Sequence, residues 1–268
     1  MVEKELTVLT EAMRAAGARA LELARRGFEV QTKRDKSPVT TADLEVNRML
    51  QEMHRIHFPD DGWLSEESPD NETRLTKPRV WIVDPIDGTK AFVNRLPEFC
   101  ISVALIEHTQ PILGAIYNPS TDELFTAVRG RGLRVNGRVC VPEAPSDGAP
   151  LVSVSPWEFR NGRWAGLDGQ VQCRPMLSIA NALALVSAGR MQASLTVEPE
   201  NEWDLAAGVL LIEEGGGTVA DGKGQGFSFN QPTPRFRGVI AVSATAPPGL
   251  RPLLQDHADR IAGTRKVS

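Results

Sequence analysis

Cysteine is scarce in this chain, and the shortage limits the kinds of site that the protein can contain. The 268 residues include only 3 cysteines, Cys100, Cys140 and Cys173. Because the count is odd and no Cys-x-x-Cys pair occurs, the sequence argues against a disulfide framework and against a thiolate zinc site. Free thiols fit a reducing compartment, and we therefore expect a cytoplasmic protein.

Long apolar runs and an excess of positive charge are also missing. No run is long enough to span a bilayer, and the charged N-terminus leads into no apolar segment, so we expect neither a membrane span nor a signal peptide. The formal net charge of -4 disfavours sequence-independent binding to nucleic acid or to anionic membranes. An anionic substrate would therefore need a local attraction, such as a bound cation or a helix N-terminus.

The order of apolar patterns predicts two lobes, which the chain length allows. Apolar residues recur every three or four positions over about residues 3–28 and from about residue 42, which predicts two amphipathic helices. Several strand-like runs follow and favour a largely antiparallel sheet. After the Pro- and Gly-rich segment 142–150, strands alternate with helices. We therefore predict an α+β lobe over residues 1–143 and an α/β lobe over residues 144–268.

Two carboxylates stand close together where an apolar run ends. In the stretch WIVDPIDGTK, Asp84 and Asp87 follow apolar residues, and Pro85 removes a backbone donor, so we predict that the strand ends at Asp84. Crowded carboxylates repel one another unless a cation compensates them. Oxygen ligands without nearby His or Cys favour Mg²⁺ or Ca²⁺ over zinc. An ordinary Asp-Gly turn is the alternative explanation.

Four other acids stand at the edges of predicted elements. Glu66 and Glu67 are adjacent in WLSEES, Asp204 begins a predicted helix in NEWDLAAG, and Asp43 begins another in KSPVTTAD. Taken singly, each is explained by a solvated loop or by the preference of acids for helix N-termini. Their shared position at element edges favours a common metal site.

Three motifs together resemble the inositol monophosphatase superfamily of Mg²⁺-dependent, lithium-sensitive phosphomonoesterases. The motifs are EE (66–67), DPIDGT (84–89) and WDLAAG (203–208), and the matches extend from Lys36 to Gly217 in the family's order. The resemblance implies a layered α-β-α-β-α sandwich of the inositol monophosphatase and fructose-1,6-bisphosphatase type. It also implies an active site between the two lobes and a small phosphorylated substrate.

Within that superfamily, several segments more closely resemble the 3'(2'),5'-bisphosphate nucleotidases, including the bacterial members. The segments are DKSPVTTAD (35–43), FPDD (58–61), SEES (65–68), DGTKAF (87–92) and the run 98–119. This branch removes the 3'-phosphate of 3'-phosphoadenosine 5'-phosphate. One alternative is an inositol-1-phosphate or other sugar-phosphate phosphatase. Another is a member that acts mainly by binding a partner such as RNA or polymerase, which the acidic balance and the complete set of acids disfavour.

Carried over by motif, the resemblance implies two Mg²⁺ ions. Glu66, Asp84 and the Ile86 carbonyl oxygen correspond to the ligands of one ion. Asp84, Asp87 and Asp204 correspond to the ligands of the second. Such a pair of cations neutralises the phosphate, lowers the pKa of the attacking water and stabilises the departing oxygen.

The same resemblance implies the groups that handle the water and the phosphate. Asp43 and Thr89 correspond to the pair that orients and activates the attacking water. Gly88 and Thr89 are expected to present backbone N–H groups to the phosphate. Glu67 is expected to support a third metal ion. Lys36 is either a phosphate contact or a solvated loop charge.

The sequence leaves the substrate contacts and the oligomeric state open. The segment Ser178-Ile179-Ala180 departs from the small-residue motif of the family, and no trusted substrate pattern surrounds it. Three acids could bind sugar hydroxyls or be exposed, namely Glu198, Glu200 and Glu202. Trp157 and Trp164 either stack on a base or pack in the interior. A cluster of four arginines within residues 129–138 is surface charge on a hairpin, a group that steers a nucleotide, or a contact with a partner subunit, such as the second copy in a homodimer.

Overall fold

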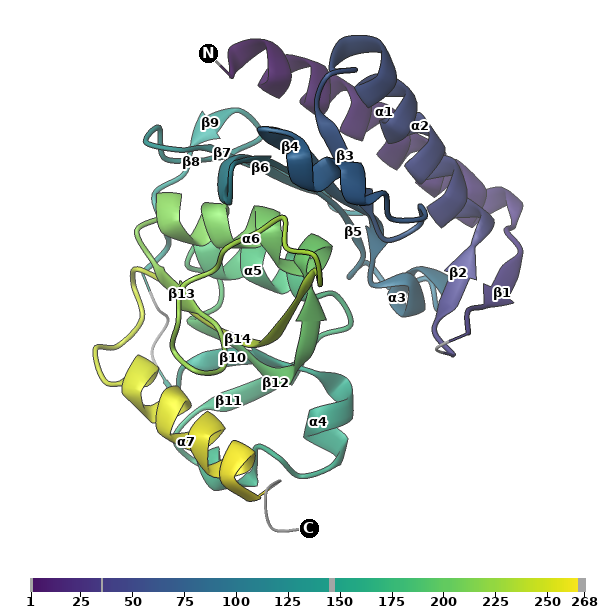
Figure 1. Cartoon of the computed structure of the whole chain (residues 1–268). Coiled ribbons are helices and arrows are strands. Elements are labelled where there is room, and N and C mark those ends of the chain that lie inside the picture. The colour runs from purple at the N-terminus through teal and green to yellow at the C-terminus, as the bar shows by residue number, and fades with distance from the viewer. Residues whose placement is uncertain (1, 35, 145–147, 265–268) are drawn as a thin grey trace.

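Helices and sheets stack in alternating layers, with helices on both outer faces and between the two sheets (Figure 1). The computed structural model describes residues 2–34, 36–144 and 148–264. The helices are α1 (Glu3–Arg26), α2 (Thr41–His57), α3 (Thr89–Val93), α4 (Pro156–Arg160), α5 (Ile179–Ser187), α6 (Glu202–Glu214) and α7 (Leu250–Thr264), with short 3-10 turns η1 (Glu72–Thr76) and η2 (Ala165–Leu167). This arrangement is the α-β-α-β-α sandwich that the sequence predicts.

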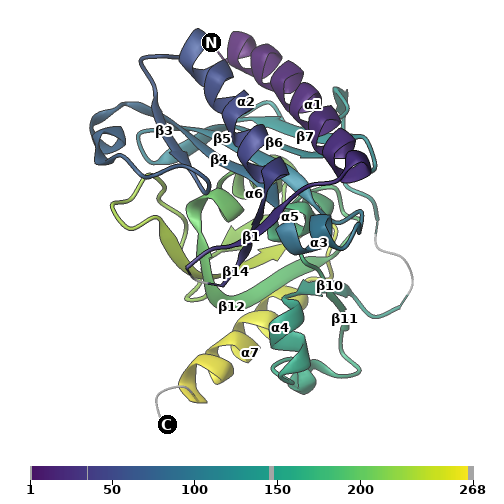
Figure 2. The same cartoon turned by 90° about the vertical axis from the view of Figure 1, so that its right-hand side faces the viewer.

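The first sheet has seven strands and is almost entirely antiparallel, as predicted. Its spatial order is β3-β4-β5-β6-β7-β8-β9, and only β3 and β4 run parallel. The strands are β3 (Gly62–Ser65), β4 (Arg79–Asp87), β5 (Cys100–Glu107), β6 (Gln110–Asn118), β7 (Glu123–Val128), β8 (Leu133–Val135) and β9 (Arg138–Val139). A separate hairpin is formed by β1 (Val30–Thr32) and β2 (Pro38–Thr40). Helices α1 and α2 cover the outer face of this sheet (Figure 2).

The second sheet has five strands and is mixed. Its order is β11-β10-β12-β14-β13, in which β10 is parallel to β11 and β12, while β14 is antiparallel to β12 and β13. The strands are β10 (Leu151–Val154), β11 (Gln172–Pro175), β12 (Ala193–Asn201), β13 (Thr218–Ala220) and β14 (Arg235–Val242). The predicted lobe boundary at 143/144 falls between the two sheets, next to residues 145–147, which lie outside the described residues. That boundary remains a prediction.

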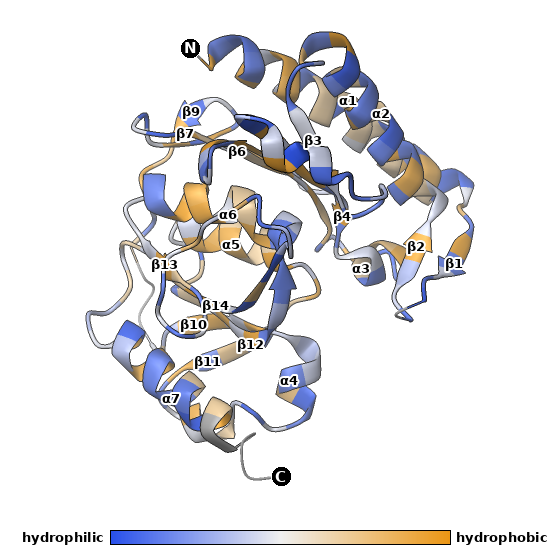
Figure 3. Cartoon of the chain, viewed as in Figure 1, coloured by the Kyte–Doolittle hydropathy of each residue, from blue (hydrophilic) through white to orange (hydrophobic). Residues whose placement is uncertain are grey.

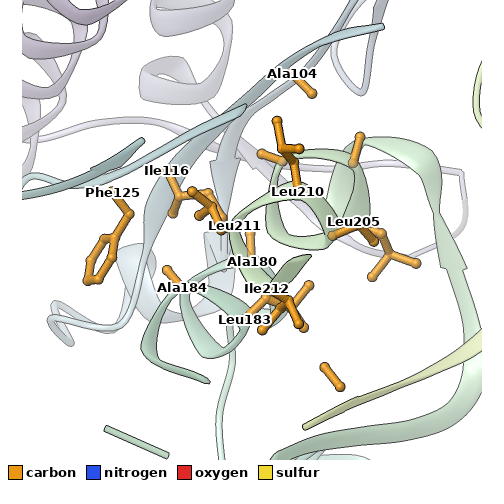
Figure 4. Close-up of a cluster of buried hydrophobic side chains, with 14 of the residues drawn as sticks. Ala104, Ile116, Phe125, Ala180, Leu183, Ala184, Leu205, Leu210, Leu211 and Ile212 are labelled. Carbon is orange, nitrogen blue, oxygen red and sulfur yellow. The ribbon is translucent and has the colours of Figure 1, made fainter. Parts of the chain in front are cut away.

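Helices α5 and α6 form the central layer, and their apolar side chains hold the two sheets together. Figure 4 shows Leu211 of α6 beside Ile116 and Leu210 pointing toward Ala104, both of the first sheet, and Ala180 and Ala184 of α5 belong to the same cluster. The same two helices are among the most hydrophobic in Figure 3, whereas α7 is largely hydrophilic. Gly208 makes this packing close, because a Cβ there would lie 2.4 Å from the Leu183 side chain. The glycine of the WDLAAG motif is therefore a packing residue.

Strand β4 differs from the prediction, because it does not end at Asp84. It continues to Asp87, with Asp84 opposite Ser102 and Asp87 opposite Cys100 of β5. Pro85 and Ile86 therefore lie opposite a single residue of β5, which is a β-bulge. Proline lacks the N–H that a regular ladder uses, and a bulge accommodates that loss without ending the strand. The bulge changes the directions of the Asp84 and Asp87 side chains, which lie on either side of it near the end of this buried strand.

No helix within residues 2–34, 36–144 and 148–264 combines the length and the apolar character that crossing a membrane would require.

Candidate active site

Three carboxylates from both halves of the chain meet at one point. Carboxylate oxygens of Asp84, Asp87 and Asp204 all lie within 4.8 Å of one another. Asp84 and Asp87 are carried by the bulge of β4, and Asp204 lies in the first turn of α6. An all-oxygen set of this density fits a hard divalent cation such as Mg²⁺. The structure thus brings together the acids that the sequence assigned to one metal ion.

Burial and mutual repulsion make these acids strong proton or cation acceptors. Burial raises the pKa of Asp84 well above its usual value, and the neighbouring carboxylates of Glu66, Asp87 and Asp204 raise it further. Burial likewise raises the pKa of Asp204, with a further contribution from Asp87. The pKa of Asp87 is raised to about 6 by burial, although hydrogen bonds partly oppose the effect. A bound divalent cation would remove this repulsion.

Asp87 is held from the second lobe by the N-terminus of α5. Its Oδ2 accepts hydrogen bonds from the Ser178 hydroxyl at 2.5 Å and from the Ala180 backbone N–H at 2.6 Å. Ser178 also caps α5 by accepting a hydrogen bond from the Asn181 N–H. In the sequence, residues 178–180 stand out only as a departure from the family motif. Their contact with Asp87 could not be found from the sequence, because 91 positions separate Ser178 from Asp87.

Asp43 and Thr89 are joined directly, as their predicted joint role requires. The Thr89 hydroxyl donates a hydrogen bond to Asp43 Oδ1 at 3.1 Å and lies 3.2 Å from the Ile86 carbonyl oxygen. Asp43 Oδ2 accepts from the backbone N–H of Thr40 at 2.8 Å and from its hydroxyl at 2.5 Å, which completes a capping box at α2. Asp43 is therefore fixed by its capping contacts while its other oxygen faces Thr89.

Gly88 joins β4 to α3 with a left-handed backbone. Its φ is 86°, and a Cβ there would lie 3.0 Å from the Ser178 Cβ, so both the turn and the approach of the second lobe require glycine. Gly88 and Thr89 stand at the start of α3, as predicted. Their phosphate-binding role remains a prediction.

Glu66 and Glu67 share one ammonium group, which the sequence analysis missed. Lys33 Nζ lies 2.8 Å from Glu66 Oε1 and 2.5 Å from Glu67 Oε1. Burial opposes the charge of Lys33, but the two carboxylates outweigh it and raise the Lys33 pKa. Burial raises the pKa of Glu67 to about 7 despite this contact. Lys36, the lysine chosen from the sequence, is exposed in the turn of the β1–β2 hairpin.

Lys33→Met is expected to make Mg²⁺ binding several-fold tighter, because a cation at Glu66 would no longer compete with an ammonium group. Titration of the thermal unfolding midpoint with Mg²⁺ measures the effect. Lys36→Met, which removes an equal charge from the same hairpin, is the control and should behave as the parent protein. An identical Mg²⁺ dependence in both variants would contradict the competition.

The metal-free protein is expected to lose stability as the pH rises from about 4 to about 7. The pKa values of Asp87 and Glu67 are raised in the folded chain to about 6 and about 7, from ordinary values of 3.8 and 4.5. Their contribution is therefore complete below the ordinary values and is lost as the pH rises through the folded ones.

Thermal unfolding with a chelator at pH 5 and pH 7.5 tests this dependence, with Asp87→Asn as the comparison. The midpoint of the parent protein should fall more over this range than that of the variant. Parallel pH profiles would show that Asp87 does not titrate in this way.

A cleft of about 360 Å³ opens beside Asp87 and Asp204. Its other walls come from α3, from β10 and α4, from the segment before α5 and from β12. Lys90, Trp157, Arg160 and Glu200 are among its lining residues, and the sequence analysis had proposed a contact only for Trp157 and Glu200. The cleft is large enough for the leaving group of a phosphate monoester to lie beside the acids.

The remaining candidates divide between structural and exposed positions. Glu202 is buried, and its carboxylate accepts backbone N–H groups from Asn230 and Gln231, so it is not a substrate contact. Trp164 packs in the interior of the second lobe. Three of the four arginines are engaged within the chain, since Arg129 pairs with Glu213, Arg131 pairs with Glu3, and Arg134 donates a hydrogen bond to the Gly137 carbonyl oxygen.

Comparisons with known proteins agree with the fold and identify the family. Residues 1–259 match the sequence model of the inositol monophosphatase family. The chain is 33% identical over 211 residues to 3'(2'),5'-bisphosphate nucleotidase CysQ of Escherichia coli (strain K12), covering 78% of this chain and 85% of that protein. It is 34% identical over 226 residues to inositol-1-monophosphatase of Bacillus subtilis (strain 168), covering 81% and 85%. A solved structure of the Thermotoga maritima IMPase matches with a TM-score of 0.83 and 28% identity, covering 98% and 99%.

Fold and relatives together define a phosphoric monoester hydrolase with a layered sandwich fold. The chain belongs to the inositol monophosphatase family. The predicted superfamily, fold class and reaction class are therefore confirmed. The two nearly equal identities leave the substrate to be argued from the site.

Proposed function

We propose that the protein is a Mg²⁺-dependent phosphomonoesterase that removes the 3'-phosphate of 3'-phosphoadenosine 5'-phosphate. The observation that carries the proposal is the convergence of Asp84, Asp87 and Asp204 beside an open cleft. Glu66, Asp84 and the Ile86 carbonyl oxygen would hold one ion, and the three aspartates a second. Glu67 would support a third. When bound, such ions neutralise the phosphate and lower the pKa of water.

The chain's own groups orient the attacking water and the phosphate. The Thr89 hydroxyl, held by Asp43, would accept the hydrogen bond of the attacking water and pass its proton toward the Asp43 carboxylate. Burial raises the Asp43 pKa, which makes the carboxylate a better proton acceptor. The backbone N–H groups of Gly88 and Thr89 would orient the phosphate oxygens. Attack in line with the leaving oxygen then directs the released alcohol into the cleft.

One observation supports the nucleotidase over an inositol phosphatase. The motif DGTKAF carries Lys90, which lies on the cleft wall, where it can receive a further anionic group. The inositol-1-phosphate alternative is supported by the Bacillus subtilis relative and by Glu200, whose carboxylate lines the cleft beside Asp204 and can accept hydroxyl groups. Burial raises the Glu200 pKa, and Asp204 adds to the effect.

Phosphate release in the presence of Mg²⁺ decides between these substrates. The assay compares 3'-phosphoadenosine 5'-phosphate, inositol-1-phosphate, fructose-1,6-bisphosphate and histidinol phosphate at equal concentrations. We expect the highest kcat/KM for the adenosine compound and inhibition by lithium at millimolar concentration or below. A low rank for the adenosine compound would reject the nucleotidase, and no release from any of the four would favour the partner-binding alternative.

The remaining parts of the proposal concern the whole molecule. Residues 1–143 would form the lobe that carries most metal ligands, and residues 144–268 the lobe that contributes Asp204 and the substrate-selecting surface. The free thiols of Cys100, Cys140 and Cys173 support a cytoplasmic location. The acidic balance supports neither nucleic acid nor membrane as a partner. A homodimer is compatible with the exposed edge strand β9.

A further inference from the structure

Two basic side chains line the otherwise acidic cleft without an ion-pair partner among the described residues. Lys90, the first of the two, lies in α3 and lines the cleft together with Asn94, the neutral residue that follows the helix. Arg160 lies at the end of α4 and lines it as well. Helices α3 and α4 lie on the same side of the molecule in both views (Figures 1 and 2). Unpaired cations that line a cleft shared with acidic side chains are suited to an anionic group of the ligand.

An exposed indole stands beside these cations. Trp157 lines the cleft and is 48% exposed, although large aromatic side chains usually bury most of their surface. The Arg163 guanidinium lies 4.9 Å from the centre of the ring and pairs with Glu198 at 3.4 Å. One side of the indole is therefore supported before any ligand arrives. A supported, exposed ring provides a platform on which another planar ring can stack.

Helix α4 is anchored so that both side chains are held at the cleft. Glu158, between Trp157 and Arg160, is completely buried, and its Oε1 accepts the backbone N–H groups of Val197 and Glu198 at 2.8 and 3.1 Å. These contacts tie α4 to the irregular part of β12, where its pairing with β14 shifts. A helix of five residues has little stability of its own, so this carboxylate fixes its place. Rigid placement favours specific recognition over general attraction of anions.

We propose that Trp157, Arg160 and Lys90 select the leaving group of the substrate. Trp157 stacks on a planar base, while Arg160 and Lys90 bind a second phosphate on the same group. This assignment rests on the proposed phosphatase activity and deepens it, because it names the side chains that would distinguish a nucleoside bisphosphate from a polyol phosphate. A polyol such as inositol has neither a planar ring nor a second anion, and it would leave these side chains unused.

Steady-state kinetics with matched substrates tests the assignment. 3'-Phosphoadenosine 5'-phosphate is compared with adenosine 3'-monophosphate, which lacks the second phosphate. Arg160→Gln and Lys90→Gln should each lower the ratio of the two kcat/KM values about tenfold or more, because a charged phosphate contact is lost. Trp157→Ala should raise KM for both nucleotides about tenfold relative to inositol-1-phosphate, and Trp157→Phe should recover most of the loss.

Two variants control for changes in charge and in helix α4. Arg251→Gln removes a positive charge from exposed α7, outside the cleft lining. Phe159→Ala removes an exposed aromatic from α4 itself, and Phe159 does not line the cleft. Both should leave the substrate ratio unchanged. An equal change of the ratio in Phe159→Ala would mean that the helix, rather than the Trp157 ring, is responsible.

Binding of adenosine 5'-monophosphate separates failure of this assignment from failure of the proposed function. The measurement uses calorimetry of the Mg²⁺-loaded protein, and the affinity should fall about tenfold in Arg160→Gln and in Trp157→Ala. If those losses occur while the bisphosphate is not hydrolysed, the proposed substrate is wrong and the subsite stands. If the bisphosphate is hydrolysed but its substrate ratio and this affinity are unchanged in the variants, the subsite is overturned.

Discussion

Asp87→Asn is expected to abolish nearly all phosphate release, with kcat reduced about a thousandfold or more. A neutral amide offers one oxygen and no charge where the proposed cation needs a carboxylate. A thousandfold lower kcat corresponds to the loss of about 4 kcal/mol of transition-state stabilisation, which is the scale expected when a metal ligand is removed. Phosphate release at saturating Mg²⁺ measures the loss, and Asp60→Asn, which removes one exposed charge from the same lobe, is the control.

The same substitution should leave the fold intact. The amide oxygen of the introduced side chain can still accept from Ser178 and from the Ala180 N–H, which hold the native carboxylate. Repulsion from the neighbouring carboxylates is removed, so the metal-free unfolding midpoint at pH 7.5 should equal or exceed that of the parent. The midpoint should also become less sensitive to Mg²⁺. Unchanged turnover would remove Asp87 from the site altogether.

Thr89→Val should reduce kcat about a hundredfold or more while the protein retains its response to Mg²⁺. Valine keeps the shape of the side chain but lacks the hydroxyl that joins Asp43 to the reaction. General acid–base assistance of this kind typically contributes factors of about 10²–10⁴. Because the proposed metal ligands are untouched, Mg²⁺ should still raise the unfolding midpoint.

Thr89→Ser restores the hydroxyl and serves as the matched control. It should recover most of the activity that Thr89→Val loses, since serine can donate the same hydrogen bond to Asp43. A serine variant as inactive as the valine variant would indicate that packing at the start of α3 matters more than the hydroxyl. Loss of the Mg²⁺ response in Thr89→Val would contradict the separation between metal binding and water activation.

Lys33 and Lys36 show that the sequence did not reveal which lysine of the hairpin contacts the site. Both lysines belong to the same short hairpin, and Lys36 was chosen because it stands within the recognised motif. The hairpin turns so that Lys33 reaches Glu66 and Glu67, while Lys36 stays exposed. A lysine side chain is long and flexible, so its partner depends on which strand lies nearby. Neighbouring positions in the sequence could not distinguish them.

The β4 bulge and the α5 clamp illustrate the same limit for the acids. Pro85 correctly indicated that the regular strand pairing is interrupted. A proline is found both at β-bulges and at strand ends, so the sequence could not tell which of the two occurs here. The contact between Ser178 and Asp87 needs the second lobe to be placed against the first. Glu200 and Glu202 differ by two positions, yet one lines the cleft and the other is buried against Asn230 and Gln231.

The sequence by itself determined the family, because the motifs EE (66–67), DPIDGT (84–89) and WDLAAG (203–208) can be recognised along the chain. The layered fold and the reaction class then followed from the resemblance to that family, while the amphipathic periods and turn residues predicted only the order of helices and strands. It also named the three aspartates that meet at the site. Tertiary structure alone decided which carboxylate is clamped by α5, which lysine neutralises Glu66 and Glu67, and which side chains line the cleft. Those features depend on distances between segments far apart in the chain, and only the packing of two sheets around α5 and α6 sets such distances.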